Sequence, residues 1–267
     1  MTDAVLVTEV DRVVTVTLNR PYAGNALDLD TARQLADVLE AVSWDAAIAV
    51  VLRGAGRAFS VGGDLREMAA SADRGAHLLK LAGHAHRAVR ALASAPVPVI
   101  AVVDGAAAGA GFAFVLGADL VIASGRSRFV LAYQAVGLTP DCGASWFLPR
   151  TVGRRRAYEI AFTNPVIGGE QARQDGIVTR LVDPEQLESE LARVLDDIRR
   201  SSRPALEGVK ALLLTDEQRV SLFAHLDAEA ASIARFAQGD DAAERIAAFL
   251  EPSGGSRSSA SDRSAGS

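Results

Sequence analysis

Two short glycine-rich stretches contain the residues whose type and spacing could do chemistry. The first spans Gly54–Leu65 after the apolar run Ile48–Leu52, and the second spans Gly105–Gly111 after Val97–Val103. Each run is β-like and each stretch leads into a segment that can be helical, so backbone N–H groups at a helix N-terminus would favour negative charge. An oxyanion hole draws its donors from separate places in a chain. If the two turns converge, they predict such a hole.

Each stretch also has an interpretation without catalysis. Glycines before a helix often serve only close packing, and Asp64 can be a plain helix N-cap. A dinucleotide-binding interpretation of the second stretch is the weakest, because the third glycine of that motif would fall at Phe114. The segment also does not open the first βαβ unit of the chain. The oxyanion and the packing interpretations both stay open.

The elements that must position these turns follow from hydrophobic periodicity. Alternating apolar residues predict strands, and apolar residues three and four apart predict helices. Strands are expected at Val5–Val10, Val13–Leu18, Ile48–Leu52, Val99–Val103 and Leu120–Ser124. Helices are expected at 28–44, around Leu78–Leu92, near 109–117, and at roughly 185–200, 204–215, 218–237 and 240–250. This alternation indicates an α/β unit with parallel pairing. The Ser/Gly/Arg-rich segment 251–267 is predicted to be disordered.

Composition argues against several classes of function. The 267 residues are 49% hydrophobic and 23% charged, which is typical of a soluble globular protein, and the net charge of −5 leaves no basic footprint for nucleic acid. The one cysteine, Cys142, excludes an intramolecular disulfide and a cysteine-based zinc cluster, and the four histidines lack a zinc motif. The sequence contains no Gly-x-Ser-x-Gly motif, so a serine hydrolase is not indicated. With no visible signal peptide and no apolar run of membrane-spanning length, we expect a cytoplasmic protein. From the cysteine and histidine pattern, we expect no metal site.

A layered α/β core with a helical C-terminal extension and both glycine turns resembles the crotonase (enoyl-CoA hydratase/isomerase) superfamily over about residues 4–250. The motifs occur in the family's order: Leu18–Pro21 with Asn25–Leu27, Phe59–Leu65, Pro98–Gly105, Gly109–Gly111, Ala118–Leu120, and Gly137–Gly143 leading to Leu148–Arg150. The resemblance implies an α/β, ClpP-like spiral fold of repeated ββα units. It implies a core over 1–200 with an acyl-CoA site, a helical trimerisation region over 201–250, and a tail over 251–267. Family members form trimers or dimers of trimers, so we expect a homotrimer or hexamer.

The resemblance gives the two turns a role. Family members bind an acyl-CoA thioester and hold its carbonyl oxygen between two peptide N–H groups, which by position are those of Gly63 and Ala110. Removing a proton beside a thioester generates an enolate whose oxygen needs donors, and one donor is typically worth about 2.7–4 kcal/mol of barrier. Coenzyme A is then part of the substrate, so no separate cofactor is expected.

The catalytic carboxylates of the family decide which reaction follows. Hydratases use two glutamates, and the matching positions here hold Ala113 and Tyr133, which cannot act as a carboxylate pair toward water. Asp141 is the carboxylate left at a family catalytic position. In isomerases of the superfamily an aspartate here moves a proton, and in 4-chlorobenzoyl-CoA dehalogenases it attacks the aromatic ring. The string Val136–Gly143 looks closest to the epoxyphenylacetyl-CoA isomerase branch, although Pro-Asp before a helix is also a common N-cap.

The resemblance also indicates residues around the substrate. His86 and Tyr133 fall where dehalogenases carry an active-site histidine and tryptophan, although His86 could equally lie on the polar flank of an amphipathic helix. Arg66 occupies the position of a basic residue that meets CoA phosphates, with Arg20 and Arg57 as further candidates. The expected set is completed by Trp146, Gly109, Ala23, Leu27, Phe59, Ser60, Val61, Asp64 and Leu65.

Three functions follow from this resemblance. The first is an acyl-CoA isomerase, of the enoyl-CoA double-bond or the epoxyphenylacetyl-CoA type, with Asp141 as proton shuttle. The second is a dehalogenase-, hydratase- or lyase-type reaction on an aryl- or acyl-CoA. The third is a crotonase homologue that binds acyl-CoA without turnover, since both hydratase glutamates are replaced.

Overall fold

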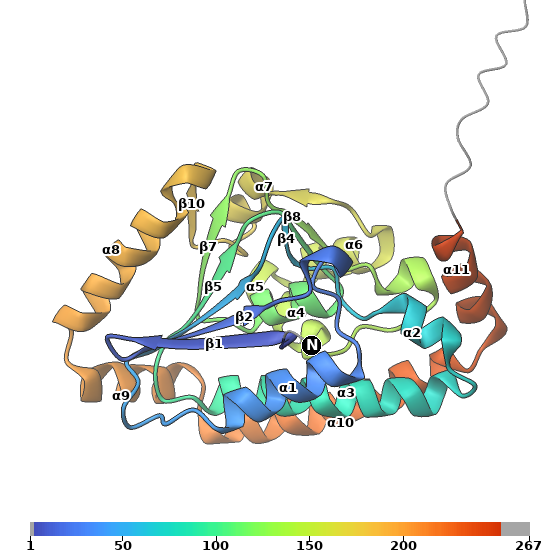
Figure 1. Ribbon diagram of the computed structural model, residues 1–267, viewed down its shortest axis with the longest axis horizontal. Helices are drawn as coiled ribbons and strands as arrows, with labels where there is room; N and C mark the ends of the chain where they lie inside the picture. The colour runs from blue at the N-terminus through green and yellow to red at the C-terminus, as the bar shows by residue number, and fades with distance from the viewer. Residues whose placement is uncertain (1–2, 252–267) are drawn as a thin grey trace, which may run out of the picture.

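Residues 3–251 are described by the computed structural model, and they form two β-sheets enclosed by helices (Figure 1). The larger sheet has the strand order β1-β2-β3-β5-β7-β10, in which β1 and β2 are antiparallel and the other neighbours parallel. The hairpin and the parallel pairing expected from periodicity are therefore confirmed. Its strands are β1 (Val5–Val10), β2 (Val13–Leu18), β3 (Ala49–Gly54), β5 (Val99–Val103), β7 (Leu120–Ser124) and β10 (Arg180–Val182).

The smaller sheet was not predicted, and it positions the glycine-rich stretches. Its order is β4-β6-β8-β9, with β9 antiparallel to β8 and the other pairs parallel. β4 and β6 lie inside the first and the second stretch, respectively. Strands of two or three residues are too short for an alternating pattern, so periodicity carries no signal for them. The strands are β4 (Ala58–Ser60), β6 (Ala106–Ala108), β8 (Arg128–Val130) and β9 (Ile167–Gly168).

Helices cover both faces of the larger sheet. Alternate residues of β3 and β5 pack against helices α1, α3 and α4 on one face and against α8 on the other. Both faces are therefore apolar, as is usual for a parallel sheet covered on two sides. Figure 1 shows α10 lying along α3 beyond this layer. The helices up to residue 174 are α1 (Leu29–Glu40), α2 (Leu65–Ala70), α3 (Arg74–Ser94), α4 (Ala110–Leu116), α5 (Ala144–Val152), α6 (Arg154–Thr163) and α7 (Gly169–Gln174).

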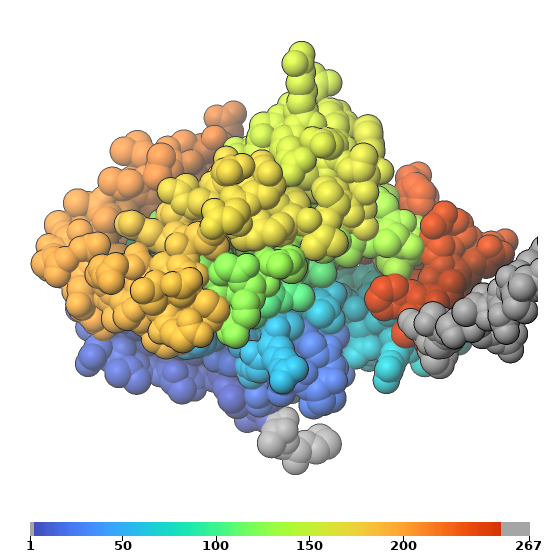
Figure 2. Space-filling model, turned by 90° about the horizontal axis from the view of Figure 1, so that it is seen from above, coloured from blue at the N-terminus to red at the C-terminus, as the bar shows by residue number. Residues whose placement is uncertain are grey.

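The C-terminal region is helical as expected. The predicted helices are confirmed, with boundaries moved by up to two residues, as α8 (Leu187–Arg200), α9 (Arg203–Leu213), α10 (Asp216–Ala237) and α11 (Asp240–Leu250). Figure 2 shows α11, in red, at one end of the molecule beside α2, in cyan. Disorder was predicted for 251–267, and residues 252–267 of that segment lie outside the described residues. Among residues 3–251, no helix combines the length and apolarity that crossing a membrane requires.

One expected helix is too long. The prediction of a helix over 28–44 is wrong at its end, because α1 stops at Glu40. The amides of Ala46 and Ala47 both turn back to the carbonyl oxygen of Ser43, each at 3.1 Å. A separate turn therefore occupies the residues between the end of α1 and the start of β3.

Candidate active site

The two glycine-rich stretches meet beside the pairing of β4 with β6. A Cβ atom on Gly62 would lie 2.9 Å from the carbonyl oxygen of Ala108 and 3.3 Å from the amide nitrogen of Ala110. Gly62 also has a φ of +93°, in the region that L side chains rarely adopt. The sequence required convergence of the turns for an oxyanion hole, and the structure brings them into contact.

The amides of Gly63 and Ala110 are placed to bind an oxyanion. Leu27 fixes the chain around Gly63, because its N–H donates to the Gly62 carbonyl at 2.8 Å and its carbonyl accepts from the Asp64 amide at 2.9 Å. Ala110 is the first residue of α4, where an amide has no partner within the helix. Within residues 3–251 neither amide donates a hydrogen bond, and both residues line one cavity.

This cavity has a volume of about 420 Å³, which is within the usual range for small-molecule sites. Its walls are mainly aliphatic and come from α2, α3, α10, α11 and the 3-10 turn Tyr133–Val136. Among the described residues that line it, Asp141 is the only carboxylate. Side-chain polar or sulfur atoms are otherwise contributed by Met68, Tyr133, Cys142 and Asn164. One carboxylate and two free amides therefore share an apolar cavity, an arrangement suited to moving a proton while an oxyanion is stabilised.

Asp141 is held by Tyr133. The Tyr133 hydroxyl donates to Asp141 Oδ1 at 2.6 Å, and both side chains are buried. Burial raises the pKa of the Tyr133 phenol well above its ordinary value, so the hydroxyl remains a donor at neutral pH. The N-cap interpretation of Asp141 is wrong: Gly143 precedes α5, and no side chain caps that helix from the cap position.

His86 lies against the same carboxylate. It is buried on α3, with Nε2 4.0 Å from Asp141 Oδ2, so it does not occupy a polar flank of the helix. The amide of Cys142 donates to His86 Nε2 at 3.1 Å, which assigns the ring proton to Nδ1. Burial lowers the pKa of His86 and favours this neutral form. The Nε2 lone pair of His86 therefore accepts a hydrogen bond from the turn that carries Asp141. A general base would need that lone pair to take a proton.

Among the described residues, one group of potential metal ligands comes together, formed by His86, Asp141 and Cys142. Their potential ligand atoms lie within 4.8 Å of one another. However, the Nε2 lone pair of His86 is occupied by the Cys142 amide. Burial also raises the pKa of the Cys142 thiol well above its ordinary value, whereas metals bind the thiolate. The three residues therefore do not fit a metal site in this arrangement.

Arg20 and Asp64, both considered for contacts with the substrate, instead stabilise the first glycine-rich stretch. The Arg20 guanidinium contacts the carboxylates of Asp28 and Asp64, each at 3.0 Å. Asp64 caps α2 by accepting from the amide of Arg66 at 3.1 Å, which confirms its N-cap interpretation. Arg66 and Arg57 are exposed, so their guanidinium groups are accessible to a phosphate.

The other predicted contacts divide between cavity and core. Those that line the cavity are Leu27, Val61, Leu65 and Gly109. Phe59 and Ser60 are buried in the core, where the Ser60 hydroxyl donates to the carbonyl of Asn25 at 2.8 Å. Ala23 lies in the 3-10 turn Pro21–Ala23 and does not line the cavity.

Trp146 is not in the cavity. The Arg150 guanidinium lies 3.4 Å from the centre of its ring, and the His225 ring centre lies 5.5 Å away. Trp146 lies in the first turn of α5, and its side chain packs toward His225 on α10. We expected it near the substrate, and this placement corrects that expectation.

Glu229 was missed by the sequence analysis. It is buried on α10 and accepts from the amides of Gly143 and Ser145, beside the Asp141 turn. Burial raises its pKa to about 7. No motif marks Glu229, and its partners lie more than 80 residues away in the chain. Periodicity alone places it on a helix without indicating what it contacts.

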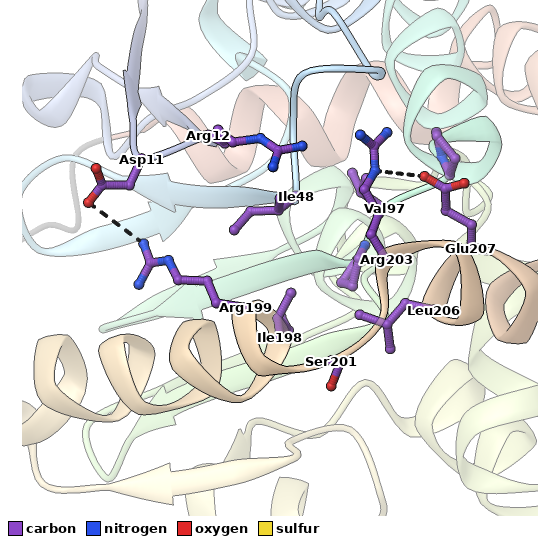
Figure 3. Close-up of a pocket in the computed structure, with 12 residues that line it drawn as sticks. Asp11, Arg12, Ile48, Val97, Ile198, Arg199, Ser201, Arg203, Leu206 and Glu207 are labelled. Atoms are coloured by element: carbon purple, nitrogen blue, oxygen red, sulfur yellow. Dashed lines mark hydrogen bonds and ion pairs between the residues drawn. The ribbon is translucent and has the colours of Figure 1, made fainter.

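A second cavity, of about 360 Å³, lies at the opposite ends of β3 and β5 (Figure 3). Figure 3 shows Arg199 directed at Asp11, 4.0 Å away, and Arg203 at Glu207, 2.8 Å away. Arg12 donates to a backbone carbonyl at 2.7 Å. These charged groups are engaged within the chain, and none of the predicted site residues lies here. The cavity beside the glycine turns is therefore the candidate active site.

Comparison with known proteins gives consistent matches. The model of the family described as "Enoyl-CoA hydratase/isomerase" matches residues 8–254. A 1,2-epoxyphenylacetyl-CoA isomerase of Escherichia coli is 41% identical over 66% of this chain and 68% of its own. A trans-2-decenoyl-[acyl-carrier-protein] isomerase of Streptococcus mutans is 35% identical over 75% and 78%. A putative enoyl-CoA hydratase of Thermobifida fusca, solved in complex with acetoacetyl-CoA, has a TM-score of 0.74 at 27% identity and covers 89% of this chain and 96% of its own.

Proposed function

Because the chain belongs to the enoyl-CoA hydratase/isomerase family, we propose that it is an acyl-CoA isomerase in which Asp141 transfers a proton between carbon atoms of the acyl group. The observation that carries the proposal is that Asp141 is the only carboxylate among the described residues lining the cavity that the Gly63 and Ala110 amides share. Two relatives named as isomerases, at 41% and 35% identity, support the same reaction class.

The proposed reaction begins with a thioester whose carbonyl oxygen lies between the two free amides. Asp141 takes a proton from the carbon atom next to the carbonyl, and the electron pair left behind delocalises into the carbonyl to form the enolate. The amides of Gly63 and Ala110 bind the enolate oxygen, where each donor is worth about 2.7–4 kcal/mol of barrier. Asp141 then returns the proton to a different carbon, so that a double bond moves and no atom is gained or lost. No separate cofactor takes part in these steps.

The geometry disfavours the two nearest alternatives. Hydration would need a second carboxylate to handle water, and Ala113 lies fully buried in α4 where a hydratase glutamate would stand. A dehalogenase-type reaction would need water activated by a base beside Asp141. His86 occupies that place, but its Nε2 accepts from the Cys142 amide. Proton transfer by Asp141 needs neither group.

We also propose that the protein assembles as a homotrimer or a dimer of trimers. α9 buries none of its residues within this chain, and Leu212 and Leu213 on it are 79% and 78% exposed. Its Lys210 is anchored to Asp119 at 2.6 Å, so the helix is fixed while its apolar face stays open. Such a face is typical of an interface between subunits. Sedimentation velocity would test the assembly, and a monomer at micromolar concentration would contradict it.

The test of the reaction is a screen of the wild type and Asp141→Asn with four substrates. These are 3-enoyl-, 2-enoyl-, epoxyphenylacetyl- and 4-halobenzoyl-CoA, with the products identified by mass spectrometry and NMR. We expect isomerisation of the first or the third by the wild type only. Isomerisation that survives in Asp141→Asn would overturn the proton-transfer role. Halide release would instead establish the dehalogenase alternative, and acyl-CoA binding without any product would establish a binding protein.

A further inference from the structure

The turn that carries Asp141 is held from outside the cavity by a buried carboxylate. Glu229, on α10, accepts hydrogen bonds from the amide of Gly143 at 2.7 Å and from the amide of Ser145 at 3.1 Å. The Ser145 hydroxyl donates to the same carboxylate. The side chain of Glu229 is 5% exposed, so these hydrogen bonds are made away from bulk water. All three donors follow Asp141 by two to four residues.

This turn has little local support. Cys142 and Gly143 have φ values of 55° and 81°, so the chain passes through two successive left-handed residues directly after Asp141. Gly143 then starts α5 without a side-chain cap, although the first amides of a helix need acceptors. Glu229 supplies acceptors to two of these amides. Glu229 on α10 thus provides the hydrogen-bond acceptors that the residues next to α5 in sequence do not provide.

The opposite side of the turn contacts the cavity. The Cys142 amide donates to His86 on α3, and Asp141 itself accepts from Tyr133. Ile233, one helical turn beyond Glu229 on α10, lines the cavity. The turn is therefore hydrogen-bonded to α3 on one side and to α10 on the other. α10 contributes Ile233 to the cavity wall and Glu229 as the acceptor for the turn.

We propose that Glu229 is a positioning residue for Asp141, because its carboxylate fixes the Cys142–Ser145 turn in the conformation that presents Asp141 to the cavity. The kinetic part of this inference rests on the proposed proton transfer by Asp141. The conformational part does not, because it concerns the turn itself. Each part has its own measurement.

The single cysteine of the chain provides the conformational measurement. Cys142 lies in the turn and is 1% exposed although it borders the cavity, so a thiol reagent should react with it slowly while the turn is closed and faster when the turn opens. Glu229→Ala removes all the acceptors, whereas Glu229→Gln keeps one oxygen that can accept from Gly143. The labelling rate with dithiobis-nitrobenzoate under native conditions is expected to rise about tenfold or more in the alanine variant and less in the glutamine variant, since about 1.4 kcal/mol of turn stability corresponds to a tenfold change.

A matched control separates this effect from the general loss of a buried carboxylate. Glu190 is 6% exposed on α8, on the far face of the larger sheet, where it pairs with Arg193 at 2.6 Å. Glu190→Ala should lower thermal stability without accelerating Cys142 labelling. Equal labelling rates in Glu229→Ala and wild type would overturn the proposal, as would equal acceleration by Glu190→Ala. If Glu229→Ala does not fold, the comparison of Glu229→Gln with Glu190→Ala decides in the same way.

The kinetic measurement uses the substrate identified in the screen described above. A positioning role predicts that Glu229→Ala lowers kcat about tenfold or more while the KM for the acyl-CoA changes little, because the cavity walls and the oxyanion amides are kept. Glu229→Gln should recover part of kcat. A folded Glu229→Ala variant with unchanged kcat would overturn the kinetic part. If wild type turns over none of the substrates, the proposed function fails, and Cys142 labelling still tests the position of the turn.

Discussion

The Tyr133 hydroxyl donates to Asp141 Oδ1 at 2.6 Å inside the cavity. Tyr133 stands at a position where the resemblance places a hydratase glutamate. Tyr133, which stands where hydratases have a glutamate, therefore donates a hydrogen bond to Asp141, the one carboxylate among the described residues that line the cavity. This hydrogen bond joins the 3-10 turn Tyr133–Val136 to the turn before α5.

Tyr133→Phe should separate the orientation of Asp141 from its chemistry. The variant keeps the ring and removes one hydrogen bond to a buried carboxylate, and such a bond is worth about 1.5–3 kcal/mol. We expect kcat to fall roughly 10- to 100-fold, because Asp141 loses the donor that orients its carboxylate. Steady-state kinetics of the variant and the wild type measure this change. An unchanged kcat would show that the hydroxyl has no influence on Asp141.

Gly62→Ala should push the two glycine turns apart. Its Cβ would lie 2.9 Å from the Ala108 carbonyl oxygen, at a φ of +93° that alanine tolerates poorly. We expect a loss of roughly 1–3 kcal/mol of unfolding free energy and a large loss of kcat, because the oxyanion donors Gly63 and Ala110 move relative to each other.

Gly83→Ala is the matched control for this glycine. It lies within α3, where a Cβ would meet nothing within 4 Å. Alanine should stabilise the helix by about 0.5–1 kcal/mol without changing kcat. Urea unfolding and steady-state kinetics of both variants check the pair. Equal kinetics in Gly62→Ala and Gly83→Ala would contradict the contact between the turns.

His86 should make the protein less stable in acid. Burial lowers its pKa in the folded state, so below its ordinary value of 6.5 the unfolded chain binds a proton that the folded chain resists. Its contribution is therefore present above about pH 6.5 and is lost as the pH falls toward the lowered pKa. His86→Gln can still accept from Cys142 but does not titrate, so it should lose less stability than wild type between about pH 7 and pH 5. Urea unfolding of both proteins at each pH measures this difference. An equal loss of unfolding free energy in the wild type and in His86→Gln would contradict the prediction.

Glu229 should act in the opposite direction. Burial raises its pKa to about 7 from 4.5, so the folded state binds the proton more tightly than the unfolded state does. Its favourable contribution is complete below 4.5 and is lost as the pH rises through about 7. Relative to Glu229→Gln, wild type should therefore lose unfolding free energy between about pH 5 and pH 8. Comparing these two proteins isolates Glu229 from nearby Asp141 and His225, and parallel pH dependences would contradict the prediction.

Much of the fold follows from local sequence. Alternation places the hairpin of β1 and β2, and helical spacing places α8 to α11 within a few residues, because both patterns extend over several turns or pleats. The glycine-rich stretches and Asp141 also stand out in the sequence, as parts of motifs with a family resemblance. What periodicity could not reveal were β4 and β6, whose short alanine-containing segments become strands only by pairing with each other.

The sequence by itself indicated, through its family resemblance, which groups could do chemistry: the amides of Gly63 and Ala110, the Asp141 carboxylate, and no hydratase carboxylate pair. Only the tertiary structure decided how they are held. Trp146 packs against Arg150 outside the cavity, and His86 uses its lone pair for the Cys142 amide. Glu229 reaches the Asp141 turn from a helix more than 80 residues further along the chain. Such partners depend on contacts between distant segments, and no local pattern of residue types encodes them.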